Sequence, residues 1–577
     1  PKLSAEYDYK HEKMLRAFNT LYAEYEIIKN LKFKTTFSYD YTTVKGEKWY
    51  DPRTSNGEDE NGEVVKRIRE YKKMVWSNTL SYLTTFNNIH HLDFLAGYEI
   101  DDTYNDYLSG EAYNFTTPDK HAISNGMKTV SVGGSDSRYR LVSYLSRLNY
   151  DYKNKYYLGA SFRVDGSSRL HRDNRWGTFW SVSGAWRTIE EEFMQPVKDW
   201  LTDLRIRASY GVNGTLPSDY FGYMGLSSIS DGYLEQPGIQ MSQIANPNLK
   251  WETNYNMNIG LDFGFWDRLN FTIEYYTRTT KNLLMDCPVS MTTGFSNYLM
   301  NIGEVKNKGI ELTINSTNIK IKDFSWNTTF NLGHNSNKVV KLDGEQTQIV
   351  SGTQIHKVGS SYRTFYVQEF AGINPETGNP LFYTNELDEN GNYIKEITEN
   401  SKNAQFIPYK HAEPTVNGGI SNSLRYKWLD LNFLFSYQFG GYSYDTWAQK
   451  TEHGGYDSYA NIPTYYRDSW KKPGDQTNIE VYMLGKSSSV SMHKITSSRR
   501  IHSTDYFRLK NITFGITLPK EWTNKINIGN VRFYASASNL WTWAAYDNYD
   551  PEAVSAGSAT QTTPPLKTVT FGLNINF

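Results

Sequence analysis

The sequence predicts an all-β protein, a transmembrane antiparallel up-and-down β-barrel, and three observations support this fold class. The final stretch alternates strictly between apolar and small or polar side chains, which is the period of a strand with one face in lipid. Aromatic residues make up 15% of the 577 residues, yet mean hydropathy is −0.64, which suits strands wetted on one face. No run reaches the roughly 18 apolar residues of a membrane helix, so only a closed barrel could cross a membrane. The apolar residues of the final stretch are Val569, Phe571, Leu573, Ile575 and Phe577.

The same alternation recurs along the whole chain in about 17 segments, each long enough for a tilted transmembrane strand of roughly 10 residues. A soluble β-sandwich also alternates, but its strands average nearer five or six residues. The predicted strands lie near residues 16–28, 31–44, 72–86, 91–102, 138–152, 155–166, 174–187, 202–213, 250–263, 267–279, 303–317, 322–336, 413–425, 427–440, 505–518, 530–542 and 566–577.

Short turns and long polar loops alternate between these strands, which assigns the short turns to the periplasmic side. The somewhat longer link Ile189–Leu201 has a helical composition. The last strand follows a long loop, so counting back makes the first strand run inward from outside. An up-and-down barrel needs an even number of strands that starts outward, so residues 1–577 are expected to form the carboxyl-terminal portion of a larger barrel. The start at Pro1, without Met or an apolar leader, fits a removed signal or part of a longer chain.

Composition and motifs argue against several classes of function. Net charge is −1 and the pI is about 7.0, so no basic field would recruit nucleic acid. Cys287 is the single cysteine, which excludes a disulfide within the chain. No phosphate-binding glycine loop, metalloprotease pattern or nucleophile elbow is present, so enzyme activity is not expected.

Two clusters are candidate metal sites. His90 and His91 are adjacent in a predicted periplasmic turn, and neighbouring strand-end residues point to opposite faces, which favours solvated turn residues. Asp388, Asn390 and Asn392 resemble the start of a calcium loop, but Gly391 falls between the ligands and no Glu closes the loop at its twelfth position. No cofactor is expected, and bound calcium at this loop is the alternative to a polar turn.

The long loops hold the candidate binding residues, because flat aromatic faces beside hydrogen-bonding groups suit oligosaccharide or peptide capture. One aromatic loop spans residues 219–233 and another spans residues 441–504. The alternative is that these aromatics pack the loops together or meet a partner protein. The candidate substrate-binding or lid-contacting residues are Tyr220, Tyr223, Trp447, Tyr456, Tyr465 and Trp470.

Specific blocks go beyond alternation. The stretch from Asn301 to Leu312, which contains Gly303 and Gly309, resembles a signature of the SusC/RagA family of TonB-dependent outer-membrane transporters from Bacteroidetes. Strand glycines such as these are expected to permit bends or close backbone approach. Further blocks in the family's order are Ser161–Arg169, Asn246–Thr253, Arg508–Pro519, Asn539–Leu540 and Tyr549–Glu552. The resemblance covers nearly the whole chain.

The resemblance implies a barrel of about 22 strands, a plug domain and an amino-terminal TonB-contacting segment, with about five strands and the plug upstream of this chain. It implies active import of oligosaccharides or peptides across the bacterial outer membrane, driven through the TonB complex. A SusD-like lipoprotein would act as a lid, in a dimer of transporter–lipoprotein pairs. Phe577 resembles a carboxyl-terminal signal for outer-membrane assembly. The alternatives are a passive porin-like or structural barrel and a soluble carbohydrate-binding β-protein.

Overall fold

The computed structural model describes residues 2–576, apart from 234–235, 343–346, 457–460, 486–487, 489, 493, 524, 526–527 and 560–562. The chain divides into two compact units. Unit 1 comprises Pro1–Ala185, Ser209–Tyr255 and Asn282–Asn301, and unit 2 comprises Trp186–Ala208, Asn256–Lys281 and Ile302–Phe577. The boundary falls within three strands, β7 (Trp176–Trp186), β8 (Leu201–Thr215) and β11 (Glu252–Phe265).

Seventeen long strands belong to one sheet, and all 17 predicted segments are confirmed as strands, with shifted ends. Among the described residues, twelve pairs of neighbouring strands within this sheet are antiparallel, so the predicted all-β class and antiparallel arrangement are confirmed. Besides β7, β8 and β11, the strands are β1 (Tyr9–Ile28), β2 (Leu31–Tyr50), β3 (Glu63–Phe86), β4 (His90–Phe115), β5 (Gly126–Tyr152), β6 (Tyr156–Ser167), β12 (Leu269–Lys281), β15 (Glu304–Lys320), β16 (Phe324–Lys341), β26 (Val416–Tyr426), β27 (Leu429–Phe439), β30 (Tyr506–Thr517), β31 (Asn530–Ala544) and β34 (Thr568–Asn576).

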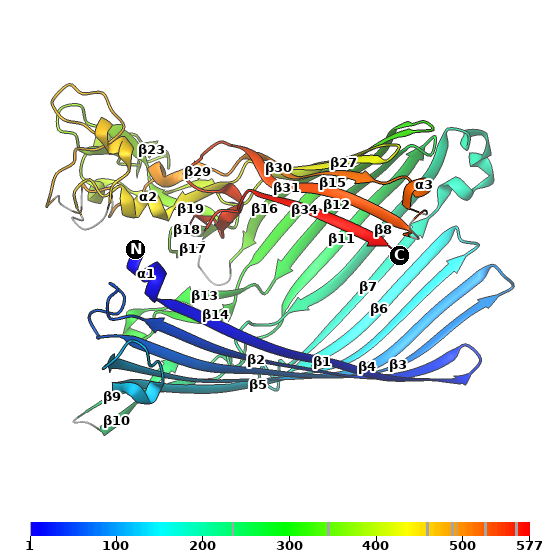
Figure 1. The fold of residues 1–577 in the computed structure, drawn as a ribbon, viewed down its shortest axis with the longest axis horizontal. Coiled ribbons are helices and arrows are strands. Elements are labelled where there is room, and N and C mark those ends of the chain that lie inside the picture. The colour runs from blue at the N-terminus through cyan, green and yellow to red at the C-terminus, as the bar shows by residue number, and fades with distance from the viewer. Residues whose placement is uncertain are drawn as a thin grey trace. The chain divides into compact units, whose positions relative to one another are not determined.

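In unit 1, strands β1 to β5 lie side by side (Figure 1) and are 20 to 27 residues long. They extend well beyond the predicted segments. For example, β4 continues to Phe115 where the predicted strand ended at residue 102, and β5 begins at Gly126 where the predicted strand began at residue 138. The added lengths of β2 and β3 are joined by ion pairs. The Lys66 ammonium lies 2.9 Å from Glu47, and the Lys48 ammonium pairs with the Glu63 carboxylate. Hydrophobic alternation therefore marks only part of each strand, and the backbone ladder continues past it.

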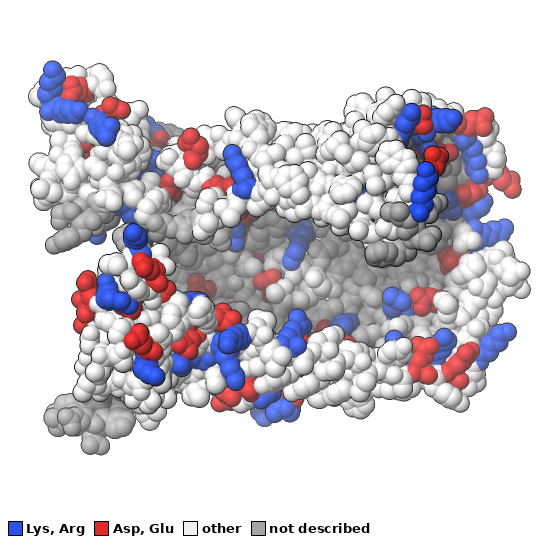
Figure 2. Space-filling model, in the orientation of Figure 1, with Lys and Arg blue, Asp and Glu red and all other residues white. Residues whose placement is uncertain are grey.

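In unit 2, the run from β12 through β15, β16, β26, β27, β30 and β31 to β34 forms a continuous antiparallel ladder. The apolar row of β34 is exposed, with Val569 at 60% and Phe571 at 80% of full exposure. Figure 2 shows few Lys, Arg, Asp or Glu side chains along the middle of β31 and β34 and many near the strand ends. An exposed apolar row on one face is what a lipid-facing strand requires. Phe577 lies outside the described residues.

The long loops are more ordered than the sequence indicated. Because their strands have two to eight residues, alternation is too short to detect. In unit 1 they contain α1 (Lys2–Tyr7), η1 (Ile123–Asn125), β9 (Leu226–Tyr233), β10 (Gln236–Gln243), β13 (Leu284–Pro288), η4 (Met291–Thr293) and β14 (Asn297–Asn301). In unit 2 they contain β17 (Gln348–Ser351), β18 (Gln354–Lys357), β19 (Thr364–Gln368), β20 (Phe370–Ile373), β21 (Pro380–Tyr383), β22 (Glu386–Leu387), β23 (Tyr393–Ile394), β24 (Ile397–Thr398), η5 (Ser401–Asn403), β25 (Phe406–His411), β28 (Tyr442–Asp445), α2 (Thr446–Thr451), η6 (Thr464–Asp468), η7 (Ser498–Arg500), β29 (Ile501–Ser503), η9 (Pro551–Ala553), β32 (Val554–Ser555) and β33 (Ser558–Ala559).

The turns of unit 2 are shorter. Two 3-10 helices, η2 (Thr188–Glu190) and η3 (Glu192–Val197), lie at the link Ile189–Leu201. They confirm the helical structure that the composition of this link indicated. The short helix α3 (Lys520–Thr523) follows β30. Among the described residues, no helix has both the length and the hydropathy to cross a membrane.

The described loop segments of unit 2 within residues 347–411, 442–503 and 545–559 are referred to as the loop module. Two clusters of buried apolar side chains hold it together. The first cluster is Phe365, Val367, Tyr444 and Ile501, and the second is Phe382, Ala404, Met492 and Ile495. Strand β28 pairs with β29 on one edge and, in parallel, with β33 on the other. The expectation of polar loops is corrected here, because the loops 347–411 and 442–503 share apolar cores, and the third loop adds β33 to the edge of β28.

Glycines of the signature block have the structural role that was expected. Gly303 has a φ of +93°, in the left-handed region that favours glycine. A Cβ on Gly309 would overlap the His334 carbonyl oxygen and lie 2.6 Å from the Tyr276 hydroxyl. Gly309 is the register partner of Tyr276, and Gly418 pairs with Tyr437 in the same way. Each tyrosine ring thus covers the glycine opposite, which confirms close approach between strands.

The adjacent histidines differ from expectation. His90 and His91 are the first residues of β4, and the turn is formed by residues 87–89. The His90 Nδ1 atom lies 2.7 Å from the Tyr150 hydroxyl, and the His91 Nδ1 atom 2.8 Å from the Thr85 hydroxyl. They are therefore hydrogen-bonded strand residues and not solvated turn residues.

Candidate functional site

The loop module contains a cavity of about 790 Å³, a volume in the range of small-ligand sites. Trp447 and Tyr465, both predicted as binding residues, lie in its lining, and Trp447 is 41% exposed. The remaining lining residues are Asp445, Ala448, Lys450, Thr451, Asn461, Ile462, Pro463 and Asn548. The cavity therefore joins two aromatic rings to ammonium, amide and hydroxyl groups.

Asp445 fixes the first wall of this cavity. It caps α2, since its Oδ1 atom accepts the backbone N–H of Ala448 at 2.7 Å. Its Oδ2 atom accepts the hydroxyl of Tyr546 at 3.0 Å. That hydroxyl also accepts a hydrogen bond from the Asn548 amide at 2.6 Å. Both carboxylate oxygens of the buried Asp445 are thus engaged within the protein.

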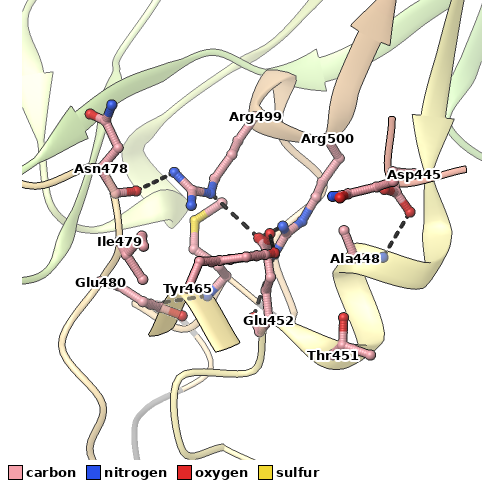
Figure 3. A network of polar contacts seen from close by, with 12 residues as sticks. Asp445, Ala448, Thr451, Glu452, Tyr465, Asn478, Ile479, Glu480, Arg499 and Arg500 are labelled. Carbon is pink, nitrogen blue, oxygen red and sulfur yellow. Dashed lines mark hydrogen bonds and ion pairs between the residues drawn. The ribbon is translucent and has the colours of Figure 1, made fainter. Parts of the chain in front are cut away.

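A network of polar contacts behind Tyr465 fixes the opposite wall (Figure 3). The Tyr465 hydroxyl donates to the Glu452 carboxylate, which also forms an ion pair with the buried guanidinium of Arg500. The Arg499 Nε atom lies 3.6 Å from the same carboxylate, and its Nη1 atom donates to the Asn478 carbonyl oxygen. Tyr465 therefore presents its ring to the cavity while its hydroxyl is held by Glu452.

Burial changes the pKa of several groups in this network. Desolvation raises the pKa of Tyr465 to about 12 and lowers the pKa of Arg500 to about 10. It also lowers the pKa of His502 to about 4, and the His502 ring stacks on Tyr546 with centroids 3.7 Å apart. At neutral pH, therefore, Arg500 is charged, whereas Tyr465 and His502 are neutral.

Lys450 is a charged lining residue that was not predicted from the sequence. It is exposed, and none of the described residues forms a hydrogen bond or ion pair with its ammonium group. It lies three residues after Trp447 on α2, a spacing that places both on one face of a helix. If the short helix α2 had been predicted from the sequence, this spacing would have indicated that Lys450 lies beside Trp447.

The other predicted residues of the loop module lie outside the lining of this cavity. Trp470 is partly buried, its indole N–H donates to the Pro375 carbonyl at 2.7 Å, and a Cβ on Gly378 would lie 2.6 Å from its ring. Tyr456 is 38% exposed, and the Lys494 ammonium lies 5.0 Å from its ring centre. Trp470 thus packs loop on loop, whereas Tyr456 remains accessible.

The two predicted residues of unit 1 make packing contacts. The Arg169 guanidinium lies 4.4 Å from the Tyr220 ring centre, and the Tyr220 hydroxyl accepts a hydrogen bond from Asn105 at 3.1 Å. Tyr223 packs against a buried cluster that contains Leu170. Both tyrosines are partly buried, so unit 1 offers less free aromatic surface at these positions than Trp447 does in unit 2.

Asp388 has the geometry of a polar turn. Its Oδ1 atom accepts the backbone N–H groups of Asn390 at 2.9 Å and Asn392 at 2.8 Å. These bonds lower the pKa of Asp388, with the bond from Asn392 the largest cause. No group of three or more His, Cys, Asp or Glu side chains suited to a metal ion occurs in the described part of the chain.

Comparisons with known proteins establish the family. The family described as "TonB dependent receptor-like, beta-barrel" matches residues 3–394. The chain belongs to this family. TonB-dependent receptor P3 of Formosa agariphila is 31% identical over 589 residues, which cover 96% of this chain and 57% of that protein. TonB-dependent receptor SusC of Bacteroides thetaiotaomicron is 29% identical over 541 residues, covering 90% of this chain and 51% of that protein.

A solved structure agrees with the family. The RagAB peptide transporter superposes with a TM-score of 0.89 and 26% identity, over 99% of this chain and 63% of the matched chain. The predicted resemblance to SusC and RagA and the outer-membrane location are thereby confirmed. The family is one of receptors and transporters. The chain spans about half to three-fifths of the length of the proteins it matches.

Proposed function

We propose that the chain is part of an active importer that carries oligosaccharides or peptides across the bacterial outer membrane. The observation that carries this proposal is the sheet of 17 strands, which superposes on the RagAB peptide transporter over 99% of its residues. A barrel that size has a lumen wide enough to require a gate. The sequence has no nucleotide-binding glycine loop, so the drive would come from the proton gradient through TonB.

The complete barrel is proposed to have about 22 strands, with a plug and TonB-contacting segment supplied by chain outside residues 1–577. Within unit 1, β1 pairs with β2, and within unit 2, β34 pairs with β31. In lipid, the backbone N–H and C=O groups on the other edge of each strand also need partners. Strands from chain outside residues 1–577 are proposed to provide them.

A SusD-like surface lipoprotein is the proposed partner, in a dimer of transporter–lipoprotein pairs. The RagAB importer has been solved in states called "closed-closed" and "open-open", which supports a two-fold assembly with two moving parts. Trp447 and Tyr465 are proposed to contact substrate, because both line the cavity. Tyr456 is proposed as a lid contact because it is accessible. The proposal extends to Tyr220, Tyr223 and Trp470 as residues that shape the loops for substrate or lid.

Uptake measurements in cells test the proposal. Cells that carry the intact protein should accumulate labelled oligosaccharide or peptide, and uptake should stop when the proton gradient is collapsed or TonB is removed. The Trp447→Ala variant should reach the outer membrane in normal amount and bind less substrate. Uptake that survives loss of the proton gradient would instead identify a passive porin. A variant lacking Phe577 tests the assembly signal, and normal membrane insertion of that variant would refute it.

A further inference from the structure

We propose that the cavity of the loop module is selective for an acidic oligosaccharide, with Lys450 as the residue that binds its carboxylate. This inference rests on the proposed function, because it names the substrate class of the same cavity.

The charge available to a ligand in this cavity is positive. Asp445 lines the cavity, but its two oxygens already accept hydrogen bonds from Ala448 and Tyr546. Glu452, behind Tyr465, is paired with Arg500. The Lys450 ammonium is exposed and has no partner among the described residues. An anionic group on the ligand would therefore find one unpaired cation, and a neutral or cationic ligand would leave that cation unpaired.

The remaining lining suits a sugar ring. Trp447, Tyr465 and Pro463 provide flat apolar faces, and the C–H face of a sugar packs well on such surfaces. The amide of Asn461 is exposed, and Asn548 uses its amino group for Tyr546, which leaves its carbonyl oxygen for a ligand hydroxyl. The Tyr465 hydroxyl donates to Glu452, so Tyr465 contributes its ring. Aromatic faces with a few placed polar groups are the usual composition of a ligand site.

The backbone favours a glycan over a peptide. Extended peptides are commonly bound by adding a strand to an open sheet edge. The strand nearest the cavity is β28, which ends at the lining residue Asp445. Both of its edges are occupied, one by β29 and one by β33. A peptide would find no open edge of β28, whereas an oligosaccharide needs only the side-chain groups described above.

Binding to the intact purified protein in detergent tests the inference. The probes are tetragalacturonate, the neutral maltotetraose and the acidic peptide tetraglutamate, each followed by calorimetry and tryptophan fluorescence. Tetragalacturonate should bind, and its affinity should fall about tenfold in Lys450→Gln, as expected for loss of one charge-assisted contact. Lys450→Arg should retain the affinity. Lys472→Gln is the matched control, since Lys472 is an exposed loop lysine outside the lining, and it should behave as wild type.

Added salt should weaken tetragalacturonate binding to wild type more than to Lys450→Gln, because salt screens an exposed charge pair. Equal affinity of wild type and Lys450→Gln for tetragalacturonate would overturn the inference. Binding of maltotetraose or tetraglutamate alone, lost in Trp447→Ala, would overturn it while leaving the proposed import function intact. If no probe bound in a Trp447-dependent manner, both the inference and the proposed substrate site would fail.

Discussion

The polar face of the sheet is crossed by many ion pairs along β1 to β6 in unit 1 and by neutral hydrogen bonds along β12, β15 and β16 in unit 2. Unit 2 also has ion pairs, where Arg207 pairs with Asp262 and Glu274, and Arg532 pairs with Asp430. In unit 1 the Lys73 ammonium lies 2.6 Å from Asp101, and the Arg163 guanidinium 2.7 Å from Asp165. Further pairs on this face are Arg16–Asp40, Arg67–Glu12 and Arg147–Asp93. In unit 2 the corresponding bonds join Tyr276 to Asn335, Asn337 to Asn307, Thr313 to Asn331 and Thr329 to Asn315.

Both arrangements satisfy the hydrogen-bonding groups of polar side chains on a solvated face, but they differ in their contribution to stability and in their response to salt. An exposed ion pair contributes roughly 0–1 kcal/mol and weakens with salt. A neutral hydrogen bond contributes about 1 kcal/mol and is insensitive to salt. The hydrogen-bonded face of β12, β15 and β16 also lies next to a cavity of about 450 Å³, whose lining includes Asn256, Asn258 and Asn307 together with the charged Arg278. Amides and hydroxyls can exchange hydrogen bonds with a hydroxyl-rich ligand without an unpaired charge.

The largest expected effect tests how tightly the strands of unit 2 approach one another. Gly309→Val places side-chain atoms against the His334 carbonyl oxygen and the Tyr276 ring. Overpacking of this kind should cost at least about 3 kcal/mol and prevent assembly of a heat-modifiable barrel in membranes. Gly134→Val in β5 of unit 1 is the control, since the nearest atom to a Cβ there is 3.4 Å away. Normal assembly of Gly309→Val would refute the close approach.

The next largest effect compares the loss of a charged contact in unit 1 with the loss of a neutral hydrogen bond in unit 2. Asp165 is 7% exposed, so Asp165→Leu in unit 1 leaves the Arg163 guanidinium without its nearest carboxylate. We expect a loss of about 2 kcal/mol in the free energy of unfolding, measured in urea with lipid vesicles. Asn331→Leu in unit 2 removes a neutral bond from Thr313 and should cost about 0.5 kcal/mol.

Salt provides the internal control for this pair of variants. The penalty of Asp165→Leu should shrink as salt rises, because the lost interaction is charged, whereas that of Asn331→Leu should stay constant. Equal penalties with equal salt dependence would remove the distinction between the two faces.

The strands were predictable because the lipid fixes the side-chain period. Val569 to Ile575 alternate with small polar residues, and such a row can be found without knowing its partners. The outer lengths of β2 and β3 were missed because charged residues that pair between the strands, Lys66 with Glu47 and Lys48 with Glu63, interrupt the apolar alternation there. Trp447 and Tyr465 were predicted from ring chemistry alone. Glu452 and Arg500 could not be, since their pairing across 48 residues depends on how the loop folds.

An effect similar in size to that of Asp165→Leu tests the buried histidine of the loop module. The pKa of His502 is lowered to about 4 by burial, with further contributions from Arg500 and Arg499, while Asp445 raises it. In the unfolded chain a histidine titrates near 6.5. Between these values the unfolded state binds more protons, so stability is complete above pH 6.5 and falls as pH drops toward 4.

The loss for His502 should be about 2 kcal/mol at pH 5. Thermal unfolding of wild type and His502→Phe at pH 5 and pH 7.5 measures it, and the variant should lose this part of the pH dependence. An unchanged pH dependence in His502→Phe would show that His502 is not held neutral.

The smallest expected effect concerns metal at the Asp388 turn in unit 2. The Asp388 carboxylate already accepts two backbone N–H groups, and a cation at the Oδ1 atom would compete with those bonds. Removing calcium from the purified protein with EDTA should therefore leave the thermal unfolding temperature unchanged. Asp388→Ala should speed hydrogen exchange at Asn392, whose backbone N–H bonds Asp388 directly. A calcium-dependent rise in unfolding temperature that disappears in Asp388→Ala would instead establish a calcium site at this turn.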